Sequence, residues 1–531
     1  MSSCAAGFEN APEHRDPIDL AIRGTIPPWL NGVLYRTGPG TTRIPTVEDP
    51  SKTVDIQHWF DGLATHHRFE VFPGGKRVSY RSRKGAEELE HRIAEAGTYP
   101  DFSFGQRGDP CQNIFRKFFT VWETVRGMGS TPSSPSARNV SVTLTPNMPG
   151  WDTTGLDLPS STGPRYIVAK TDADGLQLLD PKTLEPLVCG SYKDLDPRLD
   201  GPLSAAHSCR DHETGDFHNY SCTFAGRFPT YKVFRIGGAD GKVDILAEIK
   251  DAPPAYIHSF AMTDRYLVFC VWQAHIKQSG LSILMNKNVA ESIETDWKPQ
   301  TDTLFYVVDR RNGGIVSKYK TPPFFCFHHL NAFDDPKTGD IVIDMSVYPD
   351  NKVINLLYLE QLRNLNETTH MLMGRARRFR LQNPGDATGK DARDAVVEFT
   401  LPQEECIELP VVAPRAYHKP YRFAYGIHKK DPRVHHTFAD GIIKLDMSAG
   451  PGASTVWSLP EHTPSEPIFV PRPGAEAEDD GVLLSVVLDE QKARSAMVVL
   501  DAQSMTEVAR AEMPEVFPIG FHGVWTGRAS G

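Results

Sequence analysis

The chain has 531 residues, of which 40% are hydrophobic and 23% are charged, as in a globular protein with a sizeable core. Its formal net charge of −10 argues against a nucleic-acid partner, because such proteins carry a basic patch or stripe. The eight cysteines are scattered without a Cys-x-x-Cys pair, which argues against a disulfide framework or a zinc ribbon and predicts a reduced, cytoplasmic protein.

Most of the chain consists of short segments rich in β-branched and aromatic residues, separated by turn signals such as Asp174-Gly175 and Asp240-Gly241. In chain order the clearest segments are Gly32–Arg36, Arg165–Ala169, Tyr266–Trp272, Thr303–Asp309, Asp340–Asp344 and Gly481–Leu488. Many short strands with little helix predict an all-β fold. Over this length a propeller of repeated four-stranded blades leaves few bare sheet edges. The sequence repeats are too weak to count the blades.

Two stretches depart from the strand pattern. Residues Asn351–Leu365 have apolar residues at helical spacing and predict a helix in an insertion on the top face of the propeller. Residues Asp109–Val125 contain clustered large aromatics beside two basic residues. That composition is typical of an interfacial membrane anchor, and a buried helix with two solvated charges fits it equally well. No run of about 18 apolar residues, the length needed to span a bilayer, is present.

Four of the 19 histidines stand out by their surroundings. They are His207 in Ala206-His-Ser-Cys209, His258 in Tyr256-Ile-His-Ser-Phe260, His328 in Phe327-His-His-Leu-Asn331 and His522 in Phe521-His-Gly523. A histidine taken alone is more often a surface or core residue than a ligand. Imidazoles at the ends of apolar strands, however, would point into a dry cavity where each needs a partner. One metal ion would satisfy several of them, and four neutral imidazoles suit iron, copper, nickel or zinc.

Several unusual motifs occur in one order along nearly the whole chain. They are Leu30-Asn-Gly-Val-Leu-Tyr-Arg-Thr-Gly-Pro39, His58-Trp-Phe-Asp-Gly-Leu63, Asp109-Pro-Cys-Gln-Asn-Ile114, Tyr256-Ile-His-Ser-Phe260, Phe327-His-His-Leu-Asn-Ala-Phe-Asp-Asp335, Ser465-Glu-Pro-Ile-Phe-Val470 and Phe521-His-Gly523. In these motifs the chain resembles the carotenoid cleavage oxygenase family, in particular its fungal torulene-cleaving and retinal-forming members. The resemblance implies an all-β, seven-bladed β-propeller with helical and loop insertions forming a cap over the top face. It also implies a single propeller domain over residues 20–526, preceded by an N-terminal extension, 1–19.

The resemblance further implies a non-haem Fe(II) ion on the propeller axis, held by the catalytic histidines His207, His258, His328 and His522. At the third position two histidines are adjacent, and the family pattern His-x-x-Asn selects His328 over His329. Alternation along a strand also lets only one of two neighbours point inward. The other histidines considered are expected to be structural or on the surface: His212, His218, His329, His435 and His436.

Imidazoles bound to a metal usually donate their second ring N–H to a carboxylate, which orients the ring and tunes the metal. The resemblance assigns this role to Asp172, Glu408 and Glu466. Without it, all three would be interpreted as solvated loop acids. The family usually has Glu where this chain has Asp172, and Asp is one methylene shorter. We therefore expect that contact to be longer, bridged by water, or made by a shifted strand.

Four neutral imidazoles leave Fe(II) with a net charge of two and up to two open positions for O2 or water. Without a carboxylate ligand or a reducing cosubstrate, the electrons for O2 must come from the substrate. The predicted reaction therefore cleaves one C=C bond of a carotenoid or apocarotenoid to give two carbonyl products. The segment Asp109–Val125 resembles the membrane-facing patch with which the family extracts lipophilic substrates, so a peripheral membrane contact is expected.

Other functions stay open at this point. Stilbene-cleaving relatives are expected to anchor a phenol with a Tyr and a Lys directly before the histidine-orienting acid. Here that position is Thr171, and Lys170 is expected to point to the other face. The retinoid isomerase branch shares the ligands but uses iron for ester cleavage and isomerisation. A lactonase-type propeller hydrolase would need carboxylate and Asn ligands around calcium or zinc, and a non-catalytic binding propeller would hold no metal.

Overall fold

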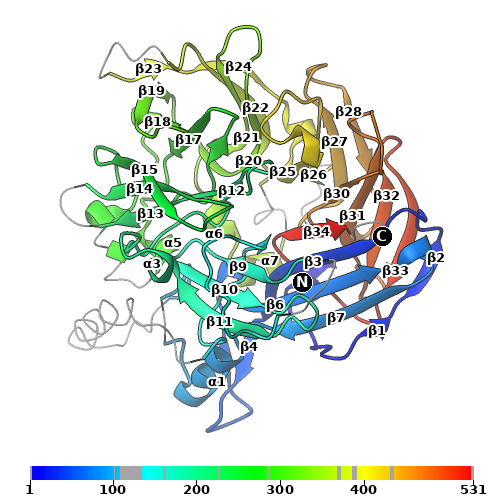
Figure 1. The fold of residues 1–531 in the computed structure, drawn as a ribbon. Coiled ribbons are helices and arrows are strands. Elements are labelled where there is room, and N and C mark those ends of the chain that lie inside the picture. The colour runs from blue at the N-terminus through cyan, green and yellow to red at the C-terminus, as the bar shows by residue number, and fades with distance from the viewer. Residues whose placement is uncertain are drawn as a thin grey trace.

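The computed structural model describes residues 3–100, 102–107, 134–158, 163–224, 228–280, 282–283, 288–366, 372–385, 391–430 and 436–527. Its strands form seven sheets of four to six strands, arranged as the blades of a propeller, and one small two-stranded sheet (Figure 1). The predicted all-β, seven-bladed propeller is therefore confirmed. The predicted membrane segment 109–125 and His435 lie outside the described residues, and the division into 1–19 and 20–526 stays a prediction.

The first three blades follow the chain from its beginning. Blade 1 contains β1 (Ile18–Asp19), β3 (Gly32–Thr41), β6 (Leu63–Val71), β7 (Val78–Lys84) and the last strand, β34 (Gly523–Gly527). Blade 2 contains β8 (Thr143–Pro146), β9 (Ile167–Lys170), β10 (Gly175–Leu179) and β11 (Pro186–Ser191). Blade 3 contains β12 (Cys209–Arg210), β13 (Phe217–Thr223), β14 (Thr230–Ile236) and β15 (Val243–Ile249).

The remaining blades complete the ring. Blade 4 contains β16 (Ala261–Met262), β17 (Tyr266–Val271), β18 (Thr303–Asp309), β19 (Ile315–Thr321) and β23 (Arg393–Asp394). Blade 5 contains β20 (Phe325–Asp334), β21 (Ile341–Tyr348), β22 (Arg375–Leu381) and β24 (Val396–Thr400). Blade 6 contains β25 (Glu408–Val412), β26 (Phe423–His428), β27 (Gly441–Asp446) and β28 (Ser454–Trp457). Blade 7 contains β2 (Ala21–Gly24), β29 (His462–Pro464), β30 (Ile468–Pro471), β31 (Gly481–Asp489), β32 (Arg494–Asp501) and β33 (Thr506–Glu512).

Helices and a small sheet lie outside the blades. The α-helices are α1 (Glu87–Ala96), α3 (Tyr192–Leu195), α5 (Val289–Ser292), α6 (Val353–Leu356) and α7 (Leu359–Arg363). The 3-10 helices are η1 (Ser3–Phe8), η2 (Trp59–Asp61), η3 (Pro73–Gly75), η4 (Lys277–Gly280), η5 (Gln403–Glu405) and η6 (Pro414–Ala416), and the small sheet pairs β4 (Arg43–Pro45) with β5 (Thr53–Asp55). Among the described residues, no helix has the length and apolar character needed to cross a membrane.

Strands in the middle of the blades are buried on both faces. Every residue of β17, β21 and β31 is buried, because neighbouring blades pack face to face. The apolar runs predicted as strands within 266–272, 303–309, 340–344 and 481–488 coincide with β17, β18, β21 and β31. A continuous apolar run, rather than an alternating one, is therefore the sequence signature of these strands.

Both ends of the chain contribute to blade 1, which closes the ring. Strand β34 pairs antiparallel with β3, in a register that joins Gly32 to Gly527 and Arg36 to Gly523. In Figure 1, β3 and the last strand, β34, accordingly lie side by side in this blade. This pairing places the loop immediately before β34, which carries His522, next to the inner ends of the other blades.

The predicted single helix over 351–365 is wrong in its continuity. The structure has two short helices, α6 and α7, with Tyr358 in an extended conformation before α7. The backbone N–H of Trp59 donates to the Leu357 carbonyl at 3.0 Å, and the Leu359 N–H donates to the Gln57 carbonyl at 2.7 Å. These pairings with a distant loop replace the hydrogen bonds that a continuous helix would make there.

Candidate metal centre

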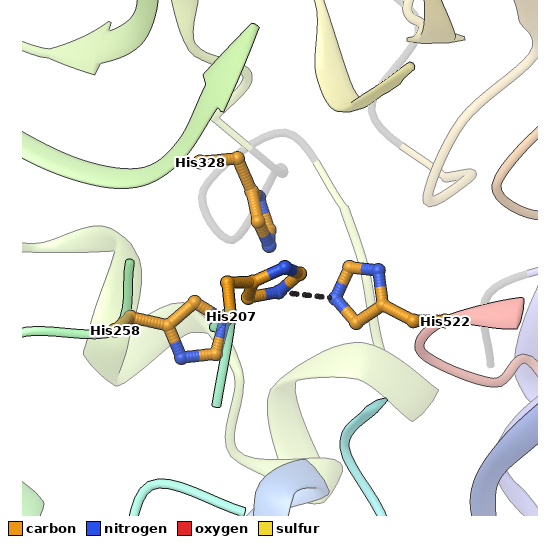
Figure 2. A group of neighbouring side chains, drawn as sticks. All are labelled: His207, His258, His328 and His522. Atoms are coloured by element: carbon orange, nitrogen blue, oxygen red, sulfur yellow. Dashed lines mark hydrogen bonds between the residues drawn. The ribbon is translucent and has the colours of Figure 1, made fainter. Parts of the chain in front are cut away.

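Four histidine side chains from distant parts of the sequence converge at one point (Figure 2). One nitrogen of each ring lies within 4.8 Å of a nitrogen of every other ring. The ring centre of His207 is 4.2 Å from that of His522 and 4.8 Å from those of His258 and His328. The structure thus brings together all four histidines that were predicted as ligands, at a spacing that one ion can bridge.

Each blade contributes one residue to this centre or to its surrounding acids. The histidines lie on or just before an edge strand of their sheet: His522 before β34 of blade 1, His207 before β12 of blade 3, His258 before β16 of blade 4 and His328 on β20 of blade 5. The acids come from the other three blades: Asp172 between β9 and β10, Glu408 at the start of β25, and Glu466 between β29 and β30. Closing the ring of blades is therefore what assembles the site.

A β-bulge in β20 aims His328 at the other histidines. Between Cys326 and His329, β20 contains one more residue than the facing part of β21, and such an extra residue re-aims a side chain. Nδ1 of the neighbouring His329 instead lies 2.8 Å from the Ser259 hydroxyl, outside the cluster. The structure therefore places His328, and not His329, in the group of four.

Three of the four histidines donate Nδ1–H to a carboxylate. The pairs are His258 with Asp172 at 2.9 Å, His328 with Glu408 at 2.6 Å, and His522 with Glu466 at 2.7 Å. Since a carboxylate only accepts, each contact fixes the ring orientation and makes Nε2 the atom with the lone pair. Nε2 of His522 lies 2.9 Å from Nε2 of His207, the contact dashed in Figure 2. Nε2 of His328 is buried and has no hydrogen-bond partner, and a metal ion would satisfy such an atom.

Asp172 reaches His258 directly in spite of its shorter side chain. Its two oxygens lie 2.9 and 3.0 Å from Nδ1 of His258, slightly farther than the glutamate contacts of the other two histidines. The expected alternative of a water bridge is therefore wrong. The Tyr256 hydroxyl lies 2.9 Å from Asp172 Oδ2 and 2.9 Å from Nδ1 of His258, so it helps to hold the aspartate against the ring.

Burial keeps two of the imidazoles, His207 and His522, neutral. Burial, together with the neighbouring rings, holds the pKa of His207 well below its ordinary range. Burial also lowers the pKa of His522 to about 4, although the adjacent Glu466 carboxylate opposes the shift. For Glu408, burial favours a higher pKa, but His328 and the Leu409 N–H outweigh it and the net shift is downward. Neutral imidazoles beside ionised carboxylates are the protonation states that bind a metal.

Glu408 is held by a strained stretch of backbone. Leu409 has a positive φ of 47°, which is unusual for a bulky residue, and its N–H donates to Glu408 Oε2 at 2.8 Å. The pairing of β25 with β26 shifts register between Glu408 and Val411 at the same place. Strain of this kind persists only where the surroundings enforce it and is common at functional sites.

An apolar cavity opens beside the histidines. His258, His328 and His522 form part of its wall. Much of the remaining wall is aromatic and comes from Trp59, Phe60, Phe327, Tyr348, Phe438 and Phe521. A cavity with so apolar a lining suits an apolar ligand.

Comparisons with known proteins agree with this geometry. The chain matches the family model described as Retinal pigment epithelial membrane protein over residues 7–527. It is 35% identical to a torulene dioxygenase of Fusarium fujikuroi, over 98% of this chain and 92% of that protein. The chain belongs to the carotenoid oxygenase family. Another relative in the family, a carotenoid dioxygenase of Neurospora crassa, is 34% identical over 98% of this chain and 90% of its own length.

Solved structures of carotenoid oxygenases share the propeller fold of this chain. A variant of the Synechocystis apocarotenoid oxygenase is 23% identical, with 98% of each chain covered and a TM-score of 0.74. The cobalt-substituted form of that oxygenase is 24% identical, with the same coverage and a TM-score of 0.71.

The carotenoid oxygenase site has an outer layer that sequence reasoning did not assign. The Tyr348 hydroxyl donates to Glu408 at 2.8 Å, and the fully buried Arg36 donates to the Glu466 carbonyl at 2.8 Å and lies 3.4 Å from its carboxylate. Arg36 lies within the motif Leu30–Pro39, so its position in a family motif was a signal in the sequence that it has a role. Tyr348 carries no local signal, because it meets Glu408 only when blades 5 and 6 pack together.

The remaining predicted positions lie away from the cluster. His212 packs against Tyr417, His218 is buried in β13, and His436 is likewise outside the group of four. Lys170 is buried, donates to the Ser208 hydroxyl and lies 5.1 Å from the Phe217 ring centre.

Proposed function

We propose that the protein is a non-haem Fe(II) dioxygenase that cleaves one C=C bond of a carotenoid or apocarotenoid into two carbonyl products. The observation that carries this proposal is a cluster of four imidazoles, without a carboxylate among the ligand atoms, beside an apolar cavity. We assign His207, His258, His328 and His522 as the ligands, and Asp172, Glu408 and Glu466 as the groups that orient three of them. The names of the torulene dioxygenase and carotenoid dioxygenase relatives support the same reaction class.

The donor set fits iron. Imidazole nitrogens suit iron, copper, nickel and zinc, and the three orienting carboxylates supply the outer contacts that tune a bound metal. When bound, Fe(II) would supply the capacity to bind and activate O2. Elemental analysis of the purified protein distinguishes iron from the other metals.

The reaction balances without a cosubstrate. One C=C bond breaks, both atoms of O2 end in the two new C=O bonds, and the substrate supplies all the electrons. The task of the chain is then to exclude water and to hold one double bond of the polyene near the histidine face. The aromatic walls around Phe60, Phe327 and Phe521 suit a flat, conjugated hydrocarbon.

The alternatives are less well supported by the geometry. A stilbene cleaver would need a phenol anchor, whereas Lys170 donates to Ser208 and is not among the cavity-lining residues. A lactonase-type hydrolase would need carboxylates as ligands, and the acids here are engaged with histidine Nδ1 atoms. A retinoid isomerase would share the ligands and is distinguished by activity without O2.

We also propose that the protein is cytoplasmic and contacts membranes peripherally through the segment 109–125. The support is sequence composition alone: in the sequence, Phe118, Phe119 and Trp122 follow two basic residues within a few positions. Changing these three aromatics to Ser should release the protein from liposomes in a flotation assay. The exposed Phe228→Ser variant is a matched control and should bind as the unmodified protein does. Unaltered partitioning of the triple variant would contradict the membrane contact.

The reaction proposal is tested by mass analysis of products after incubation with carotenoids, apocarotenals and resveratrol. We expect two carbonyl fragments from a carotenoid or apocarotenoid, whose masses identify the cleaved bond. Cleavage of resveratrol alone would instead favour the stilbene assignment. Absence of cleavage of every compound by iron-loaded protein would contradict the proposal.

A further inference from the structure

The segment before the first blade strand is built into the propeller. Phe8, in η1, is only 2% exposed, and Cys4 is fully buried. The Ile519 N–H donates to the Gly7 carbonyl at 2.8 Å, and the Ala11 N–H donates to the Gly40 carbonyl at 2.9 Å. Residues 3–11 are thus held by segments from both ends of the chain.

Phe8 lies directly behind the cavity wall. Its ring contacts the rings of Trp59 and Phe438 edge-on, with centroid distances of 5.9 and 5.8 Å. Trp59 and Phe438 both line the cavity and contact each other at 5.4 Å. Trp59 also lies 4.7 Å from Phe521, the residue before His522. The Phe8 ring is therefore one layer away from the cavity and two rings away from a metal ligand.

The same segment is tied to the helical insertion that forms another part of the wall. The Arg363 guanidinium donates to the Phe8 carbonyl at 2.8 Å and forms an ion pair with Glu9 at 3.0 Å. Arg363 ends α7, and the preceding residues Val353 and Leu357 line the cavity. Residues 8 and 9 thus join three parts of the cavity wall. These are Trp59 of η2, Phe438, and the helices α6 and α7.

We propose that Phe8 is a positioning residue that holds this wall in place and so determines which double bond of the substrate lies beside the histidines. The inference rests on the proposed function. Close packing behind the wall leaves Trp59 and Phe438 no space to retreat from the cavity while the Phe8 ring is present. Removing the ring leaves a void into which both can retreat, and a polyene that follows them presents a different bond to the metal centre.

The test compares Phe8→Ala and Phe8→Leu with Phe234→Ala, which removes an equally buried ring in the separate core between blades 2 and 3. Readouts are product masses, kcat and KM for an apocarotenal, with iron content and thermal unfolding as checks on folding. We expect Phe8→Ala to shift the cleavage position and to lower kcat at the original bond roughly 10- to 100-fold, because small misplacements of a substrate have costs of that size. Phe8→Leu should be intermediate, and Phe234→Ala should lose thermal stability while keeping the original products.

Identical products and kcat/KM for Phe8→Ala and Phe234→Ala would overturn the inference. If Phe8→Ala fails to fold, Phe8→Leu decides between the same two results. If the unmodified protein cleaves no polyene, the proposed function fails, and the inference is then judged by binding. Iron-loaded protein is titrated under argon with the apocarotenal while tryptophan fluorescence is recorded. We expect the dissociation constant of the apocarotenal to rise at least about tenfold in Phe8→Ala but not in Phe234→Ala, which would support the role of Phe8 in holding the cavity wall. Equal dissociation constants in the two variants would overturn that role.

Discussion

Each imidazole–carboxylate pair of the metal centre depends on a further buried donor. Tyr256 supports Asp172, Tyr348 supports Glu408, and Arg36 supports Glu466. A buried carboxylate is costly unless its oxygens are hydrogen-bonded. The two tyrosine hydroxyls bond to carboxylate oxygens, and Arg36 bonds mainly to the Glu466 carbonyl, so these donors hold the acids in place. The chain uses two hydroxyls and one guanidinium for the same task, and the hydroxyl of Tyr256 accompanies the one acid that is shortened.

The first prediction concerns Asp172. Asp172→Asn should weaken Fe(II) binding about 10- to 100-fold, because an amide is a poorer acceptor for Nδ1–H of His258 and no longer orients it by charge. Competition with a chelator measures the dissociation constant. Asp172→Glu is the matched control, since it keeps the charge, and should bind Fe(II) more tightly than the Asn variant. Equal affinity of the Asn variant and the unmodified protein would mean that Asp172 does not orient a ligand.

Elements, rather than single residues, decide which of two neighbouring histidines enters the site. The bulge of β20 carries His328 into the cluster and leaves His329 against Ser259. We predict that His328→Ala loses stoichiometric iron, whereas His329→Ala keeps it and loses only stability. Iron per chain, measured by elemental analysis of folded protein, separates the two. Full iron content in His328→Ala would show that the bulge does not present a ligand.

Elements are predictable from the sequence where a local pattern determines them. The apolar runs that became β17, β18 and β31 could be identified because such strands are buried on both faces. The break between α6 and α7 could not, since it depends on pairing between Leu357 and the distant Trp59. The four histidines and three acids were named from family motifs. The β20 bulge exists only once β20 pairs with β21, and the role of Tyr348 only once blades 5 and 6 pack together.

At the scale of the whole molecule, seven blades bring one site residue each to a common centre. Their number could not be counted from sequence because several blade strands are very short: β12 and β16 have only two residues each. A strand of two residues is too short to show an alternation of hydrophobic and polar residues. The pairing of β34 with β3 then closes the ring and brings His522 to histidines more than 190 residues away in sequence.

The whole fold should lose stability in mild acid because of buried neutral histidines outside the metal centre. Burial lowers the pKa of His58 and of His66 from 6.5 to about 4. The unfolded chain therefore binds more protons between those values, and the free energy of unfolding falls as the pH drops from 6.5 towards 4. Each group should contribute a loss of about 2 kcal/mol between pH 6.5 and 4.5. Urea unfolding at a series of pH values measures this.

Matched variants identify the source of that pH dependence. His58→Gln should be less stable at neutral pH but should lose less further stability in acid. His91→Gln, at an exposed position of α1, should leave the pH dependence unchanged. A slope that is the same in all three proteins would mean that His58 is not the titrating group.

The central claim is that four histidines hold an iron ion that uses O2 to cleave a polyene. Its most direct test is conversion of an apocarotenoid by iron-loaded protein, followed by absorbance and product mass, in air and under argon. The account predicts oxygen-dependent bleaching, one O2 consumed per bond cleaved and two carbonyl products, with no conversion under argon. Conversion under argon at the rate seen in air would contradict it and indicate an isomerase.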